Sequence, residues 1–208
     1  MNSTEWSTAL PSVPMAGPSR LAAAVLSSVV LWDVSGDIWR SRACDMVGRN
    51  LSPTEWSQFV SKEPGQATCL NPLVKQAAEY ALTGKRTDAS AELVELAPKV
   101  SMIQDPGLNN LVCWYGSILG NAREVMPACE RAVSAAPAYS DFYRDGRGIA
   151  RALTGNTAGA IEDLGKMAKF ARQAGLRSMA AKRERWIADL NAGANPFDEA
   201  TLMELLDE

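Results

Sequence analysis

Apolar and polar positions divide the chain into a short strand-like run and a long helical part. From Val25 to Trp32 the β-branched residues favour a strand, which a turn at Ser35-Gly36 closes. Almost all of the sequence after this turn has a pattern typical of helices. We predict three segments: a disordered lead-in (1–24), a strand with a helical stretch (25–69) and a helical domain with C-terminal capping helices (70–208).

Several helix starts are marked by a capping side chain that is followed by proline. Ser52-Pro53-Thr54-Glu55 has the form of a capping box with proline at the first helical position, so a helix should begin there. The last such signal precedes a short acidic amphipathic helix that we expect to end at Leu206. The same combination recurs at Asn71-Pro72, Asp105-Pro106 and Asn195-Pro196.

Three glycines, Gly84, Gly120 and Gly155, lie 36 and 35 residues apart. A period of this length with a central glycine is typical of a helix–turn–helix unit, in which small residues let two helices approach closely. We therefore predict an all-α fold of stacked antiparallel helix pairs with capping helices, preceded by a remnant strand near residues 25–34. Small or apolar side chains recur around the glycines: Ala77, Cys113 and Gly148 seven residues before them, and Ala89, Val125 and Ala160 five residues after them.

This pattern resembles the tetratricopeptide repeat over roughly residues 70–175. The best-matching stretches run from Leu119 to Pro137 and from Ala152 to Leu164. The consensus tryptophan early in each unit is missing, and Arg147 stands where a core leucine is usual. The resemblance implies a helical solenoid that acts as a scaffold for a protein or peptide partner.

A second resemblance lies upstream, in an ordered series of tryptophans and short motifs. The series is similar to the tail of bacterial WD-repeat proteins, and this implies a role in a bacterial signalling or regulatory assembly. About 30 residues precede it, too few for a blade plus a propeller. The alternative is therefore an accessory C-terminal fragment of a propeller–NTPase or propeller–protease protein. The series comprises Leu31-Trp32-Asp33-Val34, Trp39, Arg42-Ala43-Cys44, Gly48-Arg49-Asn50-Leu51 and Glu55-Trp56.

Composition makes several function classes improbable. The chain has no histidine, which removes the commonest general base and the commonest zinc ligand. It also lacks a phosphate-binding glycine loop, so we expect no enzyme, no cofactor and no metal site. A net charge of −3 gives no reason to expect nucleic acid, and the longest apolar stretch, Leu21–Trp32, is too short to span a bilayer. The sequence predicts no oligomeric state.

The cysteines bear on the compartment. None of the four cysteines forms a CxxC pair, which is the spacing typical of a structural zinc site. They are Cys44, Cys69, Cys113 and Cys129. An even count permits disulfides, but Cys113 and Cys129 fall at small apolar positions of the helical pattern, which favours reduced core thiols. This predicts a cytoplasmic protein. Secretion is the alternative, because Arg20 and the apolar run after it faintly resemble a signal peptide.

The candidate binding site is a groove lined by the first helix of each pair. Trp114 would anchor a peptide or a helix there, among small apolar neighbours. Two amphipathic segments of the chain itself, 52–60 and 198–207, could cover Trp114 instead, and both alternatives stay open. The expected groove residues are Val74, Ala78, Asn110, Trp114, Ser117, Asp145 and Ile149.

Arg147 is expected to point inward from its helix. An inward arginine is tolerated only if it is paired, and Asp163 on the facing helix and Glu130 on the preceding one are the expected partners. We interpret Arg147 and Asp163 as a structural polar pair, with a buried switch or ligand site as the alternative. The flanking Gly146 and Gly148 are interpreted as positions of close helix packing.

Overall fold

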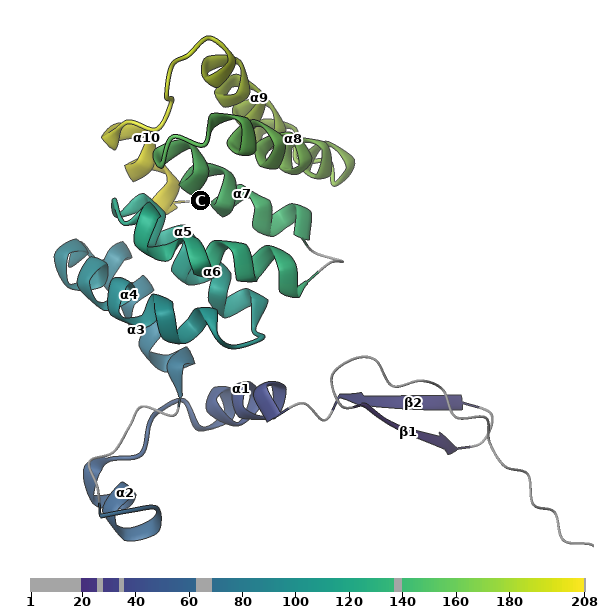
Figure 1. Cartoon of the computed structure of the whole chain (residues 1–208), viewed down its shortest axis with the longest axis vertical. Coiled ribbons are helices and arrows are strands. Elements are labelled where there is room, and N and C mark those ends of the chain that lie inside the picture. The colour runs from purple at the N-terminus through teal and green to yellow at the C-terminus, as the bar shows by residue number, and fades with distance from the viewer. Residues whose placement is uncertain (1–19, 26–27, 34–35, 63–68, 137–139, 208) are drawn as a thin grey trace, which may run out of the picture.

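The computed structural model describes residues 20–25, 28–33, 36–62, 69–136 and 140–207 (Figure 1). The first nineteen residues of the expected lead-in lie outside the described residues. The next six form strand β1 (Arg20–Val25), which pairs with the antiparallel strand β2 (Ser28–Asp33). Strand β2 lies within the segment for which a strand was expected.

Two helices follow the hairpin, α1 (Gly36–Val47) and α2 (Pro53–Phe59). The predicted capping box is confirmed at the start of α2. The backbone N–H of Glu55 donates to Ser52 Oγ at 3.3 Å, and the backbone N–H of Ser52 donates to Glu55 Oε2 at 2.8 Å. No residue of α2 is buried.

A disulfide joins Cys44, which lies within α1, to Cys69, which immediately precedes the next helix, and the two Cα atoms are 5.3 Å apart. Asn50 reinforces the junction. Its side-chain amide donates to the carbonyl of Cys69 at 3.0 Å and accepts from the backbone N–H of Cys69 at 2.8 Å. The chain between residues 44 and 69 is therefore a covalently closed loop at the entrance to the helical domain.

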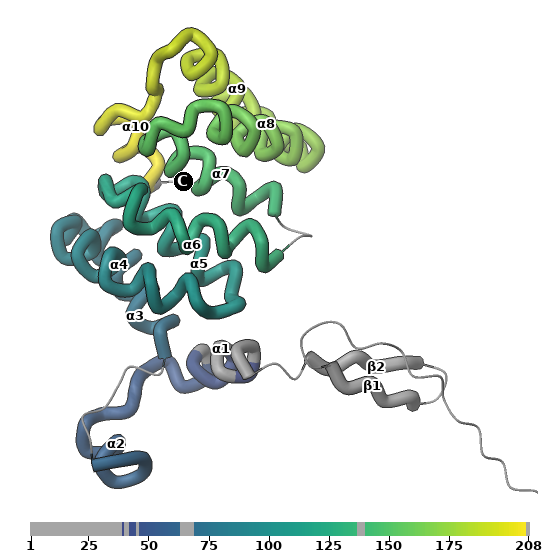
Figure 2. The backbone as a smooth tube through the Cα atoms, viewed as in Figure 1, coloured from purple at the N-terminus to yellow at the C-terminus, as the bar shows by residue number. Residues whose placement is uncertain are grey.

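The helical domain confirms the all-α prediction for residues 70–136 and 140–207. Adjacent helices pack antiparallel along the chain, and contacts also join α3 to α5, α4 to α6 and α5 to α7 (Figure 2). The elements are α3 (Leu70–Leu82), α4 (Arg86–Ser101), α5 (Pro106–Ile118), α6 (Ala122–Ala135), α7 (Ser140–Leu153), α8 (Thr157–Gln173), α9 (Arg177–Asn191), α10 (Glu199–Glu204) and the 3₁₀ helix η1 (Leu205–Asp207).

The predicted glycine turns between paired helices are confirmed. Gly120 has a φ of 88°, a conformation that costs other L-residues free energy, and the N–H of Asn121 returns to the carbonyl of Gly116 at 2.8 Å. The arrangement satisfies the carbonyl groups that end a helix. Gly84 and Gly155 make the same turn, and so do Gly175 and Gly193, which the sequence reasoning did not single out.

The predicted helix starts at proline are only partly correct. Asp105 caps α5 by accepting from the N–H of Leu108 at 2.9 Å, as expected. Helix α3, however, begins one residue before Asn71, with Cys69 at the cap position. Asn195 does not cap the last helix either, because Asp198 accepts from the N–H of Thr201 at 2.8 Å and the helix starts there.

Close packing at the predicted glycines is confirmed. A Cβ atom on Gly148 would lie 3.0 Å from Leu164 Cγ on α8, and one on Gly146 would lie 3.3 Å from Cys113 Sγ on α5. Both glycines therefore let α7 approach its neighbours. The apolar interior of the described residues forms one cluster mainly among α3–α6, a second that includes α7, α9 and the C-terminal residues, and a small third between α8 and α9.

Candidate functional site

One face shared by α5, α7 and α9, here called the α5–α7–α9 face, is divided into an open half and a covered half. The open half is a pocket between the first parts of these helices. The covered half lies under residues 195–207, which we call the C-terminal strap. On each helix the pocket residues come first and the covered residues follow at helical spacing: Leu111 and Trp114 before Ile118, Asp145 and Gly146 before Ile149 and Ala152, and Met179 and Arg183 before Trp186 and Leu190.

The pocket has a volume of about 310 Å³ and mostly apolar walls. Trp114 is half-buried at one side of it, and Phe142 on α7 is 47% exposed at the pocket. Met167 of α8 is buried, with 1% of its surface exposed. Wide aromatic and methionine walls of this kind suit a large apolar side chain. The lining residues are Asn110, Leu111, Trp114, Tyr115, Phe142, Asp145, Gly146, Met167, Met179 and Arg183.

A buried ion pair lies among the pocket residues. Arg183 donates to Asp145 through Nη2 at 2.5 Å and through Nε at 3.1 Å, and the exposed fractions of the two side chains are 1% and 8%. The guanidinium also lies 4.9 Å from the ring centroid of Trp186, and that ring meets Phe197 edge-on at 4.9 Å. The charges of the pocket are therefore paired with each other, and Trp186 connects them to the strap.

The C-terminal strap crosses from α9 back to α3 and α5. Its anchors Phe197, Leu202, Leu205 and Leu206 are at most 9% exposed, and η1 contacts both α3 and α5. On the side of α4, Arg86 lines a hollow of about 470 Å³ together with the strap residues Glu199, Leu202 and Met203. The strap therefore fills one half of the α5–α7–α9 face through a few large side chains.

The structure places the expected groove residues in two environments. Asn110, Trp114 and Asp145 line the pocket together. The segment expected as an alternative cover, 198–207, lies over the neighbouring half of the face, whereas α2 in segment 52–60 has no buried residue. The remaining expected residues are in the interior: Val74 and Ile149 at 0% exposure, Ser117 at 1% and Ala78 at 8%.

Sequence reasoning expected Asp145 of α7 at the site, but missed Phe142 on the same helix and the contributions of α8 and α9 to the pocket. Met179 and Arg183 are four residues apart on α9 and therefore share a helix face with Trp186, which is a local signal for this side of the site. The sequence reasoning assigned α9 only a capping role. Phe142 and Met167 carried no local signal that would separate them from ordinary core or surface positions.

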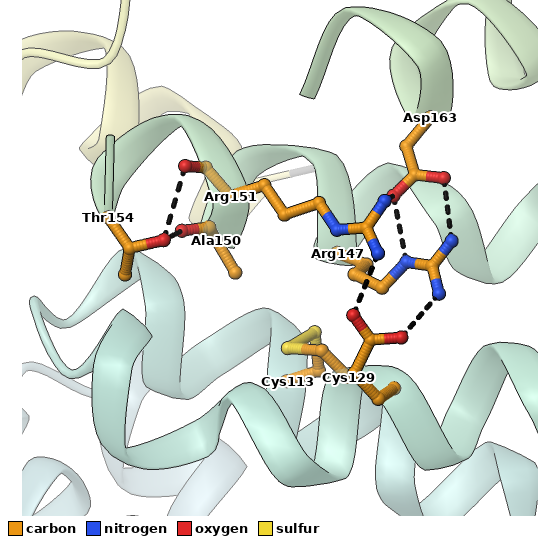
Figure 3. The surroundings of a disulfide bond; sticks show 8 residues. Cys113, Cys129, Arg147, Ala150, Arg151, Thr154 and Asp163 are labelled. Carbon is orange, nitrogen blue, oxygen red and sulfur yellow. Dashed lines mark hydrogen bonds and ion pairs between the residues drawn. A yellow bond between two sulfur atoms is a disulfide. The ribbon is translucent and has the colours of Figure 1, made fainter. Parts of the chain in front are cut away.

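Arg147 lies in a charge cluster centred on Asp163 (Figure 3). Arg147 donates to both oxygens of Asp163, at 2.7 and 2.8 Å, and to Glu130 Oε2 at 2.6 Å. Arg144 and Arg151, which sequence reasoning missed, also donate to Asp163, at 2.6 and 2.8 Å. Asp163 has no exposed side-chain surface, so one buried carboxylate on α8 joins three arginines of α7.

The electrostatics of this cluster favour a permanently charged arginine. Burial lowers the pKa of Arg147, but hydrogen bonds from its guanidinium to Asp163 and Glu130 and the charges of both partners raise that pKa further, so the net shift is upward. Arg151 adds a second link to Glu130 at 2.8 Å, which ties α6 into the network. The arrangement can fix the docking of α6, α7 and α8.

The prediction of reduced thiols is wrong, because Cys113 and Cys129 form a disulfide between α5 and α6 (Figure 3). The small side chains that suggested buried thiols let these two helices approach until the Cα atoms are 4.8 Å apart, within the range for a bridge. Cys44 and Cys69 are bridged as well. Disulfides persist mainly in oxidising compartments, so the two bridges hint at an extracytoplasmic setting instead of the expected cytoplasm.

Comparisons of the chain with protein-family models, with curated proteins and with solved structures found no match. The resemblances to tetratricopeptide and WD-repeat proteins therefore rest on the sequence pattern alone. Within the described residues, no cluster of three or more potential metal-ligating side chains occurs. In the same part of the chain, no helix combines the length and apolar character needed to cross a bilayer.

Proposed function

We propose that this chain is a non-catalytic interaction module, built from repeated helix pairs, that holds a segment of a partner protein in the open half of the α5–α7–α9 face. The observation that carries this proposal is the division of that face. One half is covered by the chain's own strap, whereas Phe142 and Trp114 leave apolar surface at the other half. A continuous apolar face that is covered only in part is typical of a surface that a second segment completes.

The chemistry of the pocket favours binding over turnover. Asp145 and Arg183 are engaged with each other, so the buried charges of the pocket serve its shape and orientation. The remaining walls are mainly aromatic and methionine side chains. Such walls provide contact area for an anchor residue, which is how a few side chains supply most of the affinity of an interface.

The setting proposed for this interaction is an oxidising compartment. Two disulfides support it, because bridged cysteines are uncommon in proteins that work among reducing thiols. Membership of a bacterial signalling or regulatory assembly is a further part of the proposal that derives only from the sequence resemblance.

An accessory role within a larger assembly is a second candidate, and exposed apolar side chains near the N-terminus favour it. Met46 is 83% exposed and Val47 60% on α1, and Phe59 is 72% exposed at the end of α2. Apolar side chains exposed to this degree on neighbouring helices suit a contact with another polypeptide.

Peptide display on the native, oxidised chain tests the main proposal. Peptides enriched on the native chain are expected to lose about tenfold in affinity on Phe142→Ala, which removes an exposed anchor contact. Met102→Ala is the matched control, since it removes a large exposed apolar side chain outside the pocket. If no enriched peptide distinguishes Phe142→Ala from Met102→Ala, the pocket is not the binding site.

A further inference from the structure

The C-terminal strap shows which kind of segment the α5–α7–α9 face accepts. Residues 195–208 contain five carboxylate side chains and no lysine or arginine. Their apolar anchors enter the face while α10 presents its acidic residues beside them. The occupant of the covered half is thus a short, acidic, amphipathic helix. Four of the five carboxylates, those of Asp198, Glu199, Glu204 and Asp207, belong to the described strap.

Basic side chains lie beside the strap's carboxylates. Lys182 Nζ on α9 lies 3.9 Å from Glu204 Oε2. Arg86 on α4 lines one hollow together with Glu199 and another together with Glu204. The covered half therefore combines an apolar floor with positive charge at its edge, which is complementary to the strap.

The open half repeats this combination. Beside the pocket lies a second hollow of about 440 Å³, and the two share Met179 and Arg183. Exposed Arg177 and half-buried Lys182 line this hollow, next to Leu176, which is 46% exposed. Positive charge therefore borders the aromatic pocket on the side of α9.

The nearby carboxylates already have basic partners. Asp145 is bound to Arg183, and Asp141 on α7 lies 3.5 Å from Arg144. These pairs reduce the negative charge that an approaching segment would meet. Lys182 has Glu204 of the strap as a partner at 3.9 Å, so the positive charge offered at the border of the pocket is mainly that of exposed Arg177.

We propose, building on the function proposed above, that the open pocket binds an acidic amphipathic segment of a partner protein, with a large apolar anchor against Trp114 and Phe142 and carboxylates beside Arg177. The partner segment then continues along the same helix faces on which the strap lies. The partner segment and the strap would lie on adjoining halves of one face. We therefore expect both to combine apolar anchors with carboxylates.

The chain's own C-terminal sequence supplies a defined probe. A fluorescein-labelled peptide of residues 195–208 is titrated into the full-length, oxidised chain and followed by fluorescence anisotropy. Two further peptides serve as comparisons: one carries lysine in place of every Asp and Glu, and one carries alanine in place of Phe197 and the leucines. The acidic peptide is expected to bind saturably, and the two altered peptides at least about tenfold more weakly.

Paired variants locate the binding. Phe142→Ala and Arg177→Glu are each expected to weaken the acidic peptide about tenfold, with the loss on Arg177→Glu shrinking at high salt. Met102→Ala and Arg123→Glu are the controls, because both alter exposed residues that do not line the pocket. Neither control should change the affinity.

The other outcomes overturn the inference in distinguishable ways. Equal binding of the lysine-substituted peptide, still lost on Phe142→Ala, would leave the proposed function standing and remove the acidic partner. Binding that no pocket variant weakens would mean exchange with the strap itself. Self-association of the native chain that Phe142→Ala abolishes would identify a second copy as the occupant. A failure of both this titration and the peptide display would remove the proposed function as well.

Discussion

Arg183 stacks its guanidinium on the ring of Trp186 while its nitrogens bind Asp145, so one side chain spans the two halves of the α5–α7–α9 face. Trp186 in turn meets Phe197 of the strap. The pocket and the strap therefore share a boundary that consists of Arg183 and Trp186. A substitution of Asp145 or Arg183 should therefore affect both the pocket and the packing of the strap.

The first prediction concerns this ion pair. Asp145→Ala leaves a buried arginine without its carboxylate and is expected to lower the free energy of unfolding by about 3–5 kcal/mol. Urea denaturation measures the loss. Lys99→Ala is the control, because the pair between Lys99 and Glu95 is exposed and should contribute at most about 1 kcal/mol. Similar losses for both variants would contradict the burial of Asp145 and Arg183.

The second prediction concerns the carboxylate at the centre of the arginine cluster. Asp163→Asn keeps the shape of the side chain but removes the charge that three arginines share, and we expect a loss of about 3–5 kcal/mol in urea denaturation. Glu130→Gln removes a charge that is 48% exposed, so at most about 1 kcal/mol should be lost there. The reverse order of the two losses would refute the central role of Asp163.

The third prediction concerns the buried disulfide. Thiol titration of the denatured, unreduced chain should find no free cysteine. The double variant Cys113→Ala, Cys129→Ala opens a loop with a sequence separation of 16 and should cost about 3 kcal/mol of stability. A chain purified under oxidising conditions that still titrates as four thiols would rule out both bridges.

The fourth prediction concerns pH. Hydrogen bonds from Arg49 and from the backbone of Ser52 lower the pKa of Glu55 from 4.5 to about 2. A lowered folded-state pKa stabilises the α2 cap above pH 4.5, and this contribution is lost as the pH falls through about 2. A carboxyl NMR titration should show the low value, and Arg49→Ala should move the midpoint upward. An unchanged midpoint in that variant would show that Arg49 does not hold the carboxylate.

The turns of the helical domain were the part of the fold most open to sequence reasoning. Gly84, Gly120 and Gly155 recur at a fixed period, and a helix end that needs a positive φ has a local chemical cause. The inward arginine was likewise expected beside Asp163 and Glu130. Such features depend on neighbours within one or two helices along the chain.

The pocket could not be predicted in the same way, because it depends on contacts between distant segments. Arg183 and Asp145 are 38 residues apart, and nothing in the period of either helix marks them as partners. The cysteines illustrate the same limit. Their small size was evident from the pattern, but only the closeness of α5 and α6 decides between two thiols and a bridge.

The bridge between Cys44 and Cys69 has a consequence for how the molecule would respond to proteases. A cut anywhere within the 25-residue span would leave both products tied to each other at the start of α3. Such a nicked chain would migrate as two fragments only after reduction. Its N-terminal portion would stay attached to the helical domain after cleavage, although the peptide connection had been lost.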